Sequence, residues 1–268
     1  MAQADGSAPA RPVAVVIGGA SGIGWATARA LATDGYRVVI ADRDFDGAQE
    51  KSAELGEPHQ AVAVDVTDEG TVASLFEGTG AIDVVVNTAG FGDYGRIVDM
   101  ETERFRAVVD VCLIGAFVVT KYAGRYLNPG GSLVSIASLN ARLAAAGVSS
   151  YCSAKAGLAM LTQVAALELA PNKVRVNAVS PGLVMTPLTE LVAQVPGAFE
   201  EFLENTPIGR VGTPEDVADA VSFLCSDKAS WLTGVVLDLN GGAHLMRYPD
   251  VLGRIDAMVA GTTAGQPQ

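Results

Sequence analysis

The residues most able to take part in a chemical reaction are Tyr151 and Lys155, four positions apart in the segment Ser149–Ala170. The apolar residues of this segment recur at steps of three and four, which predicts a helix carrying both side chains on one face. A phenol in water ionises at about pH 10 and is a poor base at neutral pH. An ammonium group fixed beside it stabilises the phenolate, so such a pair can transfer a proton. Many helices carry this pair by chance, so other groups must support the interpretation.

Ser138 supplies a hydroxyl group that could act with this pair. It follows the apolar segment Ser132–Ile136, which is predicted to be a strand. Ligands of open parallel sheets bind outside the carboxyl ends of the strands. From that edge the hydroxyl could hydrogen-bond a substrate oxygen and orient it toward Tyr151. A serine at this place more commonly closes a turn or caps a helix, and the sequence leaves that alternative open.

Short β-branched segments alternate with longer segments of helical periodicity along the chain. Strands covered on both faces are continuously apolar, and the predicted strands have that character. Strand–helix alternation with right-handed crossovers predicts an α/β fold built on a doubly wound parallel sheet. The predicted strands are Val13–Ile17, Arg37–Ala41, Ala61–Val64, Ile82–Val86, Ser132–Ile136, Val174–Val179 and Val235–Leu239.

Capping residues mark the ends of two predicted helices. The helix Gly22–Thr33 is followed by Asp34 and Gly35, and Gly35 can adopt a left-handed cap. A second helix begins at Pro214, with Thr213 as its cap and Asp216 closing a capping box. Between the sixth strand and that helix, residues 183–212 contain three prolines and no regular pattern. We expect this segment to form a ligand lid.

The composition limits the possible partners and location. No linker or repeat follows residue 12, so we predict a flexible tail at residues 1–11 and a single domain at 12–268. The net charge of −12 argues against binding nucleic acid and mildly against an acidic carrier protein. No uninterrupted apolar run of about 20 residues and no signal-peptide pattern occur. The cysteines Cys112, Cys152 and Cys225 lack disulfide or metal-ligand spacing, so we expect a cytoplasmic protein without a metal.

The first predicted strand leads into the glycine-rich turn Gly18–Gly24 and then a helix. Glycine lets backbone N–H groups approach a pyrophosphate at a helix N-terminus, although this pattern alone also fits a tight turn. Asp42 closes the second strand, where a carboxylate can accept hydrogen bonds from the adenosine ribose. A 2'-phosphate there would meet like charge, so Asp42 favours NAD over NADP. Arg43 leaves NADP as an alternative cofactor, because an arginine at this turn can bind the 2'-phosphate.

These motifs together resemble the short-chain dehydrogenase/reductase family, from about Arg11 to Ala243. The family's TGxxxGxG motif corresponds to residues 17–24, its NNAG motif to residues 87–90, and its YxxxK motif to residues 151–155, with the companion serine at Ser138. The pair against the adenine corresponds to residues 65–66, and the PG motif to residues 181–182, followed by two nicotinamide contacts. The resemblance implies cofactor contacts at Gly18, Ser21, Gly22, Ile23, Gly24, Asp65, Val66, Asn87, Ala89, Gly90, Tyr151, Lys155, Pro181, Gly182, Val184 and Thr186.

The same resemblance implies a Rossmann-type fold, usually a homotetramer, and proton transfer through Tyr151 coupled to hydride transfer. Two positions depart from the family pattern. Ile17 replaces a threonine whose hydroxyl normally ties the glycine turn together. Cys112 replaces an asparagine to which the family assigns a helix bulge and a proton-relay water near the lysine. A thiol is a weak donor and acceptor, and we interpret Cys112 as a small buried apolar residue.

We therefore expect an NAD-dependent oxidoreductase with Ser138, Tyr151 and Lys155 as its catalytic residues. The alternatives are an NADP-dependent 3-oxoacyl reductase and a non-catalytic dinucleotide sensor. The apolar residues of the lid and of the turn after the fourth strand favour a hydrophobic secondary alcohol or ketone, with a cyclic one among the candidates. They are Leu188, Leu191, Val192, Val195, Phe199, Phe202 and Leu203 in the lid, and Phe91 and Tyr94 in the turn.

Overall fold

The computed structural model describes residues 11–187 and 189–264, so most of the predicted tail and Leu188 lie outside the described residues. Seven strands form one parallel sheet in the order β3-β2-β1-β4-β5-β6-β7. The predicted doubly wound α/β fold is therefore confirmed. The strands are β1 Val13–Ile17, β2 Arg37–Asp42, β3 Gln60–Ala63, β4 Ile82–Asn87, β5 Leu127–Ile136, β6 Arg175–Pro181 and β7 Val236–Leu239.

One strand, β5, begins much earlier than predicted. β5 starts at Leu127 rather than Ser132, and its pairing with β4 shifts register between Ile82 and Val84. The added residues include Pro129 and two glycines, which are unfavourable in regular strands and typical of irregular pairing.

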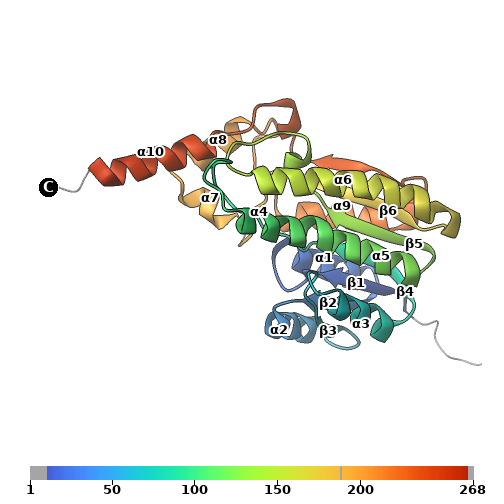
Figure 1. Cartoon of the computed structure of the whole chain (residues 1–268). Coiled ribbons are helices and arrows are strands. Elements are labelled where there is room, and N and C mark those ends of the chain that lie inside the picture. The colour runs from blue at the N-terminus through green and yellow to red at the C-terminus, as the bar shows by residue number, and fades with distance from the viewer. Residues whose placement is uncertain (1–10, 188, 265–268) are drawn as a thin grey trace, which may run out of the picture.

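Helices cover both faces of the sheet (Figure 1). One face packs against α1 Gly22–Thr33, α2 Phe45–Leu55 and α9 Pro214–Cys225, and the other against α3 Glu69–Thr79, α5 Ala116–Tyr126 and α6 Ser149–Leu169. On β1, Ala14 and Val16 face the first group, whereas Val15 and Ile17 face the second. Because both sets of alternating residues are buried, the strand must be apolar throughout.

The local helix signals are confirmed. Thr213 and Asp216 form a reciprocal capping box, with Pro214 in the first turn of α9. Gly35 follows α1 with a φ of +95°.

The sheet has a topological switch point beside β1. Its neighbours are β2 and β4, and Ile17, its last residue, lies between Ala41 and Asn87. The chain leaves β1 toward one face through α1 and passes to the other face before β4. Loops that diverge at the carboxyl ends of adjacent strands leave a crevice in which ligands bind.

The helical run Thr102–Tyr126 comprises α4 Thr102–Val109, a π-helical turn η1 Asp110–Gly115 and α5. By length and composition alone it is apolar enough to cross a membrane. In the fold it packs along the sheet, with Val108 and Val119 fully buried in the interior, whereas Ile114 and Phe117 are half exposed. Core helices meet the same length and composition criterion.

The segment expected to be an irregular lid contains two short helices, α7 Glu190–Gln194 and α8 Ala198–Glu204. Beyond β7 the chain forms a further helix, α10 Val251–Ala264, which the sequence patterns did not predict. Figure 1 shows α10 running outward from the body beside α8. The buried lid residues Val192 and Phe202 pack with Val251 of this last helix. Part of the lid's apolar surface is therefore covered by the C-terminal segment rather than being open to a substrate.

Candidate active site

The glycine turn after β1 is shaped for close backbone approach. Gly18 has a φ of +79°, and a Cβ atom on Gly24 would lie 2.0 Å from the carbonyl oxygen of Gly18. Ser21 precedes α1 without capping it through its side chain, and the first turn of this helix carries no acidic residue. The N–H groups and the positive end of the helix dipole are thus available to an anion.

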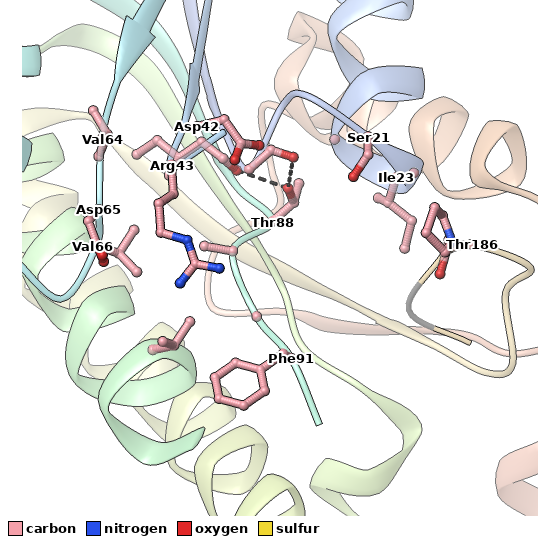
Figure 2. A pocket seen from close by; sticks show the side chains of 18 residues that line it. Ser21, Ile23, Asp42, Arg43, Val64, Asp65, Val66, Thr88, Phe91 and Thr186 are labelled. Atoms are coloured by element: carbon pink, nitrogen blue, oxygen red, sulfur yellow. Dashed lines mark hydrogen bonds between the residues drawn. The ribbon is translucent and has the colours of Figure 1, made fainter. Parts of the chain in front are cut away.

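Thr88 ties this turn to β4. Its hydroxyl lies 2.9 Å from the carbonyl oxygen of Ile17 and 3.0 Å from that of Gly18 (dashed in Figure 2). The family's threonine is absent at position 17, and a hydroxyl from the neighbouring strand bonds the turn instead. The turn is therefore still held by a hydroxyl group, although residue 17 is isoleucine rather than threonine.

Asp42 stands at the end of β2 and lines the cavity in front of the glycine turn. Its Oδ2 accepts a hydrogen bond from the N–H of Ala20 at 3.0 Å, and its Oδ1 accepts one from the N–H of Asp44 at 3.0 Å. Each carboxylate oxygen can accept a further hydrogen bond. The carboxylate is thus held in place with acceptor capacity left for a ligand's hydroxyl groups.

Arg43 is exposed and extends into the same cavity, between Asp65 and Phe91 (Figure 2). Its charge helps to lower the pKa of Asp65, although the hydrogen bonds from the backbone and hydroxyl of Thr67 contribute more. The guanidinium therefore interacts with a carboxylate of the protein itself.

Lys155 and Tyr151 lie together at the other end of the crevice. Lys155 is buried, at 3 % exposure, and its Nζ donates a hydrogen bond to the carbonyl oxygen of Ile136 at 2.6 Å. The same Nζ lies 5.6 Å from the centre of the Tyr151 ring. An ammonium has three donors, so two remain for other partners on that side. The structure thus places a fixed cation beside the phenol, as the spacing predicts.

Ser138 lies in the same small cavity as Tyr151 and Lys155, of about 110 Å³. Its Oγ accepts a hydrogen bond from the N–H of Asn140 at 3.1 Å. The hydroxyl hydrogen of Ser138 is then free to be donated to a ligand oxygen. The helix-capping alternative also applies, because Ser138 caps the short turn Leu139–Ala141.

The π-helical turn η1 is present although Cys112 stands where the family has asparagine. The thiol is buried and donates a hydrogen bond to the carbonyl oxygen of Phe91 at 3.3 Å. A Cβ atom on Gly90 would lie 3.3 Å from this sulfur and 3.4 Å from Nζ of Lys155. The bulge next to the lysine therefore forms without an asparagine side chain.

Most of the predicted site residues line two adjoining cavities. Asn87 lines neither: it is buried, and its side chain accepts a hydrogen bond from the N–H of Ala89. The larger cavity, of about 580 Å³, contains Gly18, Ser21, Gly22, Ile23, Gly24, Asp42, Arg43, Asp65, Val66, Ala89, Gly90 and Thr186. The smaller contains Ser138, Tyr151, Lys155, Pro181, Gly182, Val184 and, again, Ile23, Gly90 and Thr186.

Several lining residues were not predicted. Most of them are next in sequence to a predicted site residue, so they could have been predicted from that position. Thr88 could have been found inside the Asn87–Gly90 motif, because its hydroxyl follows the end of a strand. The additional residues are Ile17, Val64, Thr88, Val111, Pro187, Ile136, Ala137 and Thr189.

The two cavities share Ile23, Thr88, Gly90 and Thr186, so they run together from Asp42 to Tyr151. These cavities fit a dinucleotide with its ribose at Asp42. The glycine turn leaves space that a Cβ atom would fill, the N-terminus of α1 can bind the pyrophosphate, and the Asp42 carboxylate can bind the ribose. Within residues 11–187 and 189–264, no group of three or more His, Cys, Asp or Glu side chains could hold a metal ion.

The family model described as enoyl-(acyl carrier protein) reductase matches residues 18–244. The chain belongs to the short-chain dehydrogenase/reductase family. A solved short-chain dehydrogenase/reductase from Mycobacterium ulcerans is similar to it, with a TM-score of 0.88 and 32 % identity, over 92 % of this chain and 94 % of the other. The predicted family and Rossmann-type fold are therefore confirmed, and the protein is an oxidoreductase of this family.

Two further members of the family are similar to this dehydrogenase/reductase. The cis-4-hydroxycyclohexanecarboxylate dehydrogenase of Sinomonas cyclohexanicum is 41 % identical over 88 % of this chain and 98 % of its own. The 3-ketoacyl-(acyl-carrier-protein) reductase of Brucella melitensis, solved in complex with NADH, has a TM-score of 0.80 and 33 % identity, over 87 % of this chain and 98 % of that chain.

Proposed function

We propose that this protein is an NAD-dependent dehydrogenase that interconverts a hydrophobic cyclic secondary alcohol and its ketone. The observation that carries the choice of NAD is the Asp42 carboxylate, fixed by two backbone N–H groups at the adenosine end of the cavity. A carboxylate there binds two ribose hydroxyls and repels a 2'-phosphate. Arg43, the alternative phosphate ligand, lines the same cavity, and its charge acts on Asp65.

The proposed reaction follows from the arrangement at the other end. The alcohol's oxygen accepts a hydrogen bond from the Ser138 hydroxyl and gives its proton to the Tyr151 phenolate. Lys155 stabilises the phenolate with its charge and has donors left for the nicotinamide ribose. The bound nicotinamide supplies the hydride acceptor in oxidation and the hydride donor in reduction.

The substrate class draws on the cavity walls and on one relative. Phe91 packs on the same apolar cluster as Tyr151, and Ile136 lines the catalytic cavity. Apolar walls with a few polar groups suit a hydrophobic ring. The name of the Sinomonas protein describes a ring alcohol as its substrate.

Titration of the intrinsic fluorescence with both cofactors tests the proposal. NAD should bind at least tenfold more tightly than NADP, a difference of about 1.4 kcal/mol. Asp42→Ala should remove most of this preference. Asp227→Ala removes the same charge outside both cavities and should keep it. Equal or reversed affinities in the parent protein would reject Asp42 as the selector and favour Arg43.

A carrier-bound 3-oxoacyl substrate with NADP is the second candidate, favoured by the similarity to the Brucella reductase. The charge of −12 opposes docking of an acidic carrier. A third candidate, a non-catalytic sensor, is disfavoured because Ser138, Tyr151 and Lys155 share one cavity. Turnover with NAD and a ring alcohol separates the first candidate from both others.

We also propose a homotetramer. Ile114 and Phe117 on the helical run 102–126, and Met160, Val164 and Leu167 on α6, are apolar side chains between 42 % and 78 % exposed. Burying such stripes against a second copy would remove them from water. Light scattering at micromolar concentration should give the mass of a tetramer, and a monomer would reject the proposal.

A further inference from the structure

Thr189 lines the catalytic cavity but belongs to none of the sequence motifs described above. It lies in the loop after β6, immediately before α7 begins at Glu190. A threonine at such a position commonly caps the helix through its side chain. The side chain of Thr189 makes no capping hydrogen bond to α7. Its hydroxyl group is therefore available for other partners.

Those partners are in the part of the loop that directly follows β6. The Thr189 hydroxyl donates a hydrogen bond to the carbonyl oxygen of Val184 at 2.6 Å and lies 3.1 Å from the carbonyl oxygen of Thr186. Its oxygen accepts a hydrogen bond from the N–H of Thr186 at 3.0 Å. Val184 and Thr186 are the two residues expected to contact the nicotinamide. One hydroxyl group thus bonds to the backbone of both.

The same loop is held at a second place by the residues before α9. Val184 forms an isolated parallel bridge with Gly212. The N–H of Met185 donates to the carbonyl oxygen of Gly212 at 3.2 Å, and the N–H of Gly212 donates to that of Leu183 at 2.8 Å. The backbone of this loop is therefore fixed by Gly212 and by Thr189.

Thr189 also decides which way the Thr186 hydroxyl donates. The two hydroxyl oxygens lie 3.3 Å apart, and this distance alone lets either of them be the donor. The one hydroxyl hydrogen of Thr189 already points to a carbonyl oxygen, which cannot donate. Thr186 is therefore the donor of the pair, and lone pairs of its oxygen remain for an N–H of a ligand.

Thr186 lies where the cofactor cavity and the catalytic cavity meet, since it lines both. It stands across from the glycine turn, close to Ile23 (Figure 2). A Cβ atom added to Gly22 would lie 3.3 Å from the methyl carbon of Thr186. A ligand that passes from one cavity to the other must therefore run beside this hydroxyl group.

We infer that Thr189 is a positioning residue for the nicotinamide: it orients the Thr186 hydroxyl so that its oxygen accepts a hydrogen bond from the carboxamide N–H. This inference rests on the proposed function, which supplies the nicotinamide cofactor. Without the Thr189 hydroxyl, the hydrogen of Thr186 is free to turn toward the carboxamide N–H, and two donors then face each other. Affinity for the nicotinamide half should fall. The adenosine half lies at Asp42, away from this contact, and should bind as before.

Binding of NADH and of ADP-ribose tests the inference, because ADP-ribose is the cofactor without its nicotinamide. Calorimetric titration of the parent should show tighter binding of NADH. Thr189→Val keeps the branched shape and should weaken NADH binding roughly fivefold, with a change of less than about twofold for ADP-ribose. Unchanged binding of ADP-ribose also reports that the variant is folded.

Two further variants serve as controls. Thr189→Ser keeps the hydroxyl group and should bind both ligands as the parent does. Thr162→Val removes a buried hydroxyl that bonds within α6 and lines neither cavity, so it should change neither affinity. Equal weakening of NADH and ADP-ribose in Thr189→Val is the result of a purely structural role and would overturn the inference.

A double variant tests whether Thr189 acts through Thr186. Thr186→Val should weaken NADH binding by itself, and adding Thr189→Val should cause little further loss, because the group to be positioned is gone. Losses that add in full would overturn the inference.

Turnover of a ring alcohol such as cyclohexanol separates this inference from the proposed function. If the parent binds NADH without turnover, the dehydrogenase function falls, and the role of Thr189 stands when the contrast between NADH and ADP-ribose holds. If the parent turns over the alcohol while Thr189→Val binds NADH as tightly as the parent, the function stands and the role of Thr189 falls. A parent that binds NADH no more tightly than ADP-ribose also overturns the inference.

Discussion

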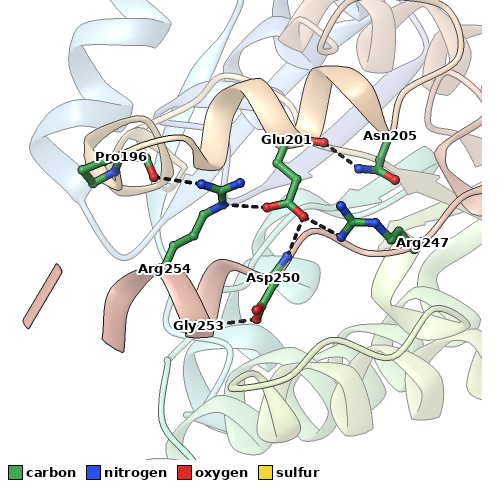
Figure 3. A network of polar contacts seen from close by, with 7 residues as sticks. All are labelled: Pro196, Glu201, Asn205, Arg247, Asp250, Gly253 and Arg254. Carbon is green, nitrogen blue, oxygen red and sulfur yellow. Dashed lines mark hydrogen bonds and ion pairs between the residues drawn. The ribbon is translucent and has the colours of Figure 1, made fainter. Parts of the chain in front are cut away.

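The cofactor end and the substrate end of the crevice are held in place by different means. At the cofactor end, the backbone turn after β1, the first turn of α1 and the carboxyl end of β2 present N–H groups and one carboxylate. At the substrate end, the lid helix α8 and the C-terminal segment 247–256 are joined by side chains, since Glu201 of α8 bonds to Arg247 and Arg254 (Figure 3). The first end depends on the sheet's own geometry, the second on bonds between distant segments.

This difference indicates which changes each end tolerates. A sheet register cannot be altered locally without disturbing the core, so the cofactor end should be rigid. A network of a few side chains can be altered without moving a strand. We therefore expect substitutions at the substrate end to change selectivity and local stability, and those at the cofactor end to change dinucleotide affinity.

The largest expected effect lies where the two ends meet. Tyr151→Phe keeps the ring but removes the proton-transfer group, so turnover should fall at least about 10²-fold. Affinity for NAD should remain nearly unchanged. Lys155→Met should reduce both, because the ammonium serves the phenol and the cofactor. Steady-state kinetics with parallel NAD titrations measure the contrast. A Tyr151→Phe protein that kept most of its turnover would contradict the assignment.

The next effect concerns the substrate end alone and depends on pH. The pKa of Glu201 is about 2 in the folded protein, against an ordinary value of 4.5. Its contribution to stability is therefore present above about pH 4.5 and is lost as the pH falls toward 2, on the order of 3 kcal/mol in total. Glu201→Gln lacks this contribution at every pH.

Urea unfolding of the parent, Glu201→Gln and Glu200→Gln between pH 7 and pH 3 measures it. The gap between the parent and Glu201→Gln should narrow as the pH falls. Glu200, exposed on the same helix, should show no such gap. A gap that stays constant with pH would show that the charge of Glu201 contributes nothing to stability through its ion pairs with Arg247 and Arg254.

A smaller effect is expected at the cofactor end. Thr88→Val keeps the branched shape and removes the hydroxyl that bonds to Ile17 and Gly18. One lost hydrogen bond of about 1 kcal/mol should weaken NAD binding roughly fivefold. Thr120→Val, which removes a hydroxyl bonded within α5, is the matched control. Equal NAD affinities in both variants would show that the turn keeps its shape without Thr88.

The smallest effect is expected at Cys112. The π-helical turn forms around a thiol with one weak hydrogen bond to Phe91. Cys112→Ala should therefore lower kcat less than about threefold, since a thiol bond contributes little. A loss of tenfold or more would assign Cys112 a positioning role beside Lys155.

Local signals predicted much of the molecule. The bounds of α1, the capping box at Thr213 and the Gly18–Gly24 turn depend on residues a few positions apart. The central strands were found because burial on both faces demands apolar residues. The early start of β5 was missed because Pro129 and its glycines conceal it. Propensity and periodicity describe such short-range features well.

The unpredicted features depend on contacts between distant parts of the chain. Thr88 bonds to Ile17 across 71 positions, and Glu201 to Arg254 across 53. In the sequence, Glu201 is one of two adjacent acidic residues and is indistinguishable from an exposed one. The position of the C-terminal segment 247–256 was missed for the same reason, since it is fixed by partners that no local pattern identifies.

The C-terminal segment 247–256 has a practical consequence for redesign. It follows the last strand of the sheet, so residues 247–256 can be exchanged as a cassette without cutting any strand pairing. A graft would have to retain arginines facing Glu201, because a docking point without them leaves a buried charge unpaired. Within that constraint, the residues between the two arginines can be varied while the contacts at the cofactor end stay as they are.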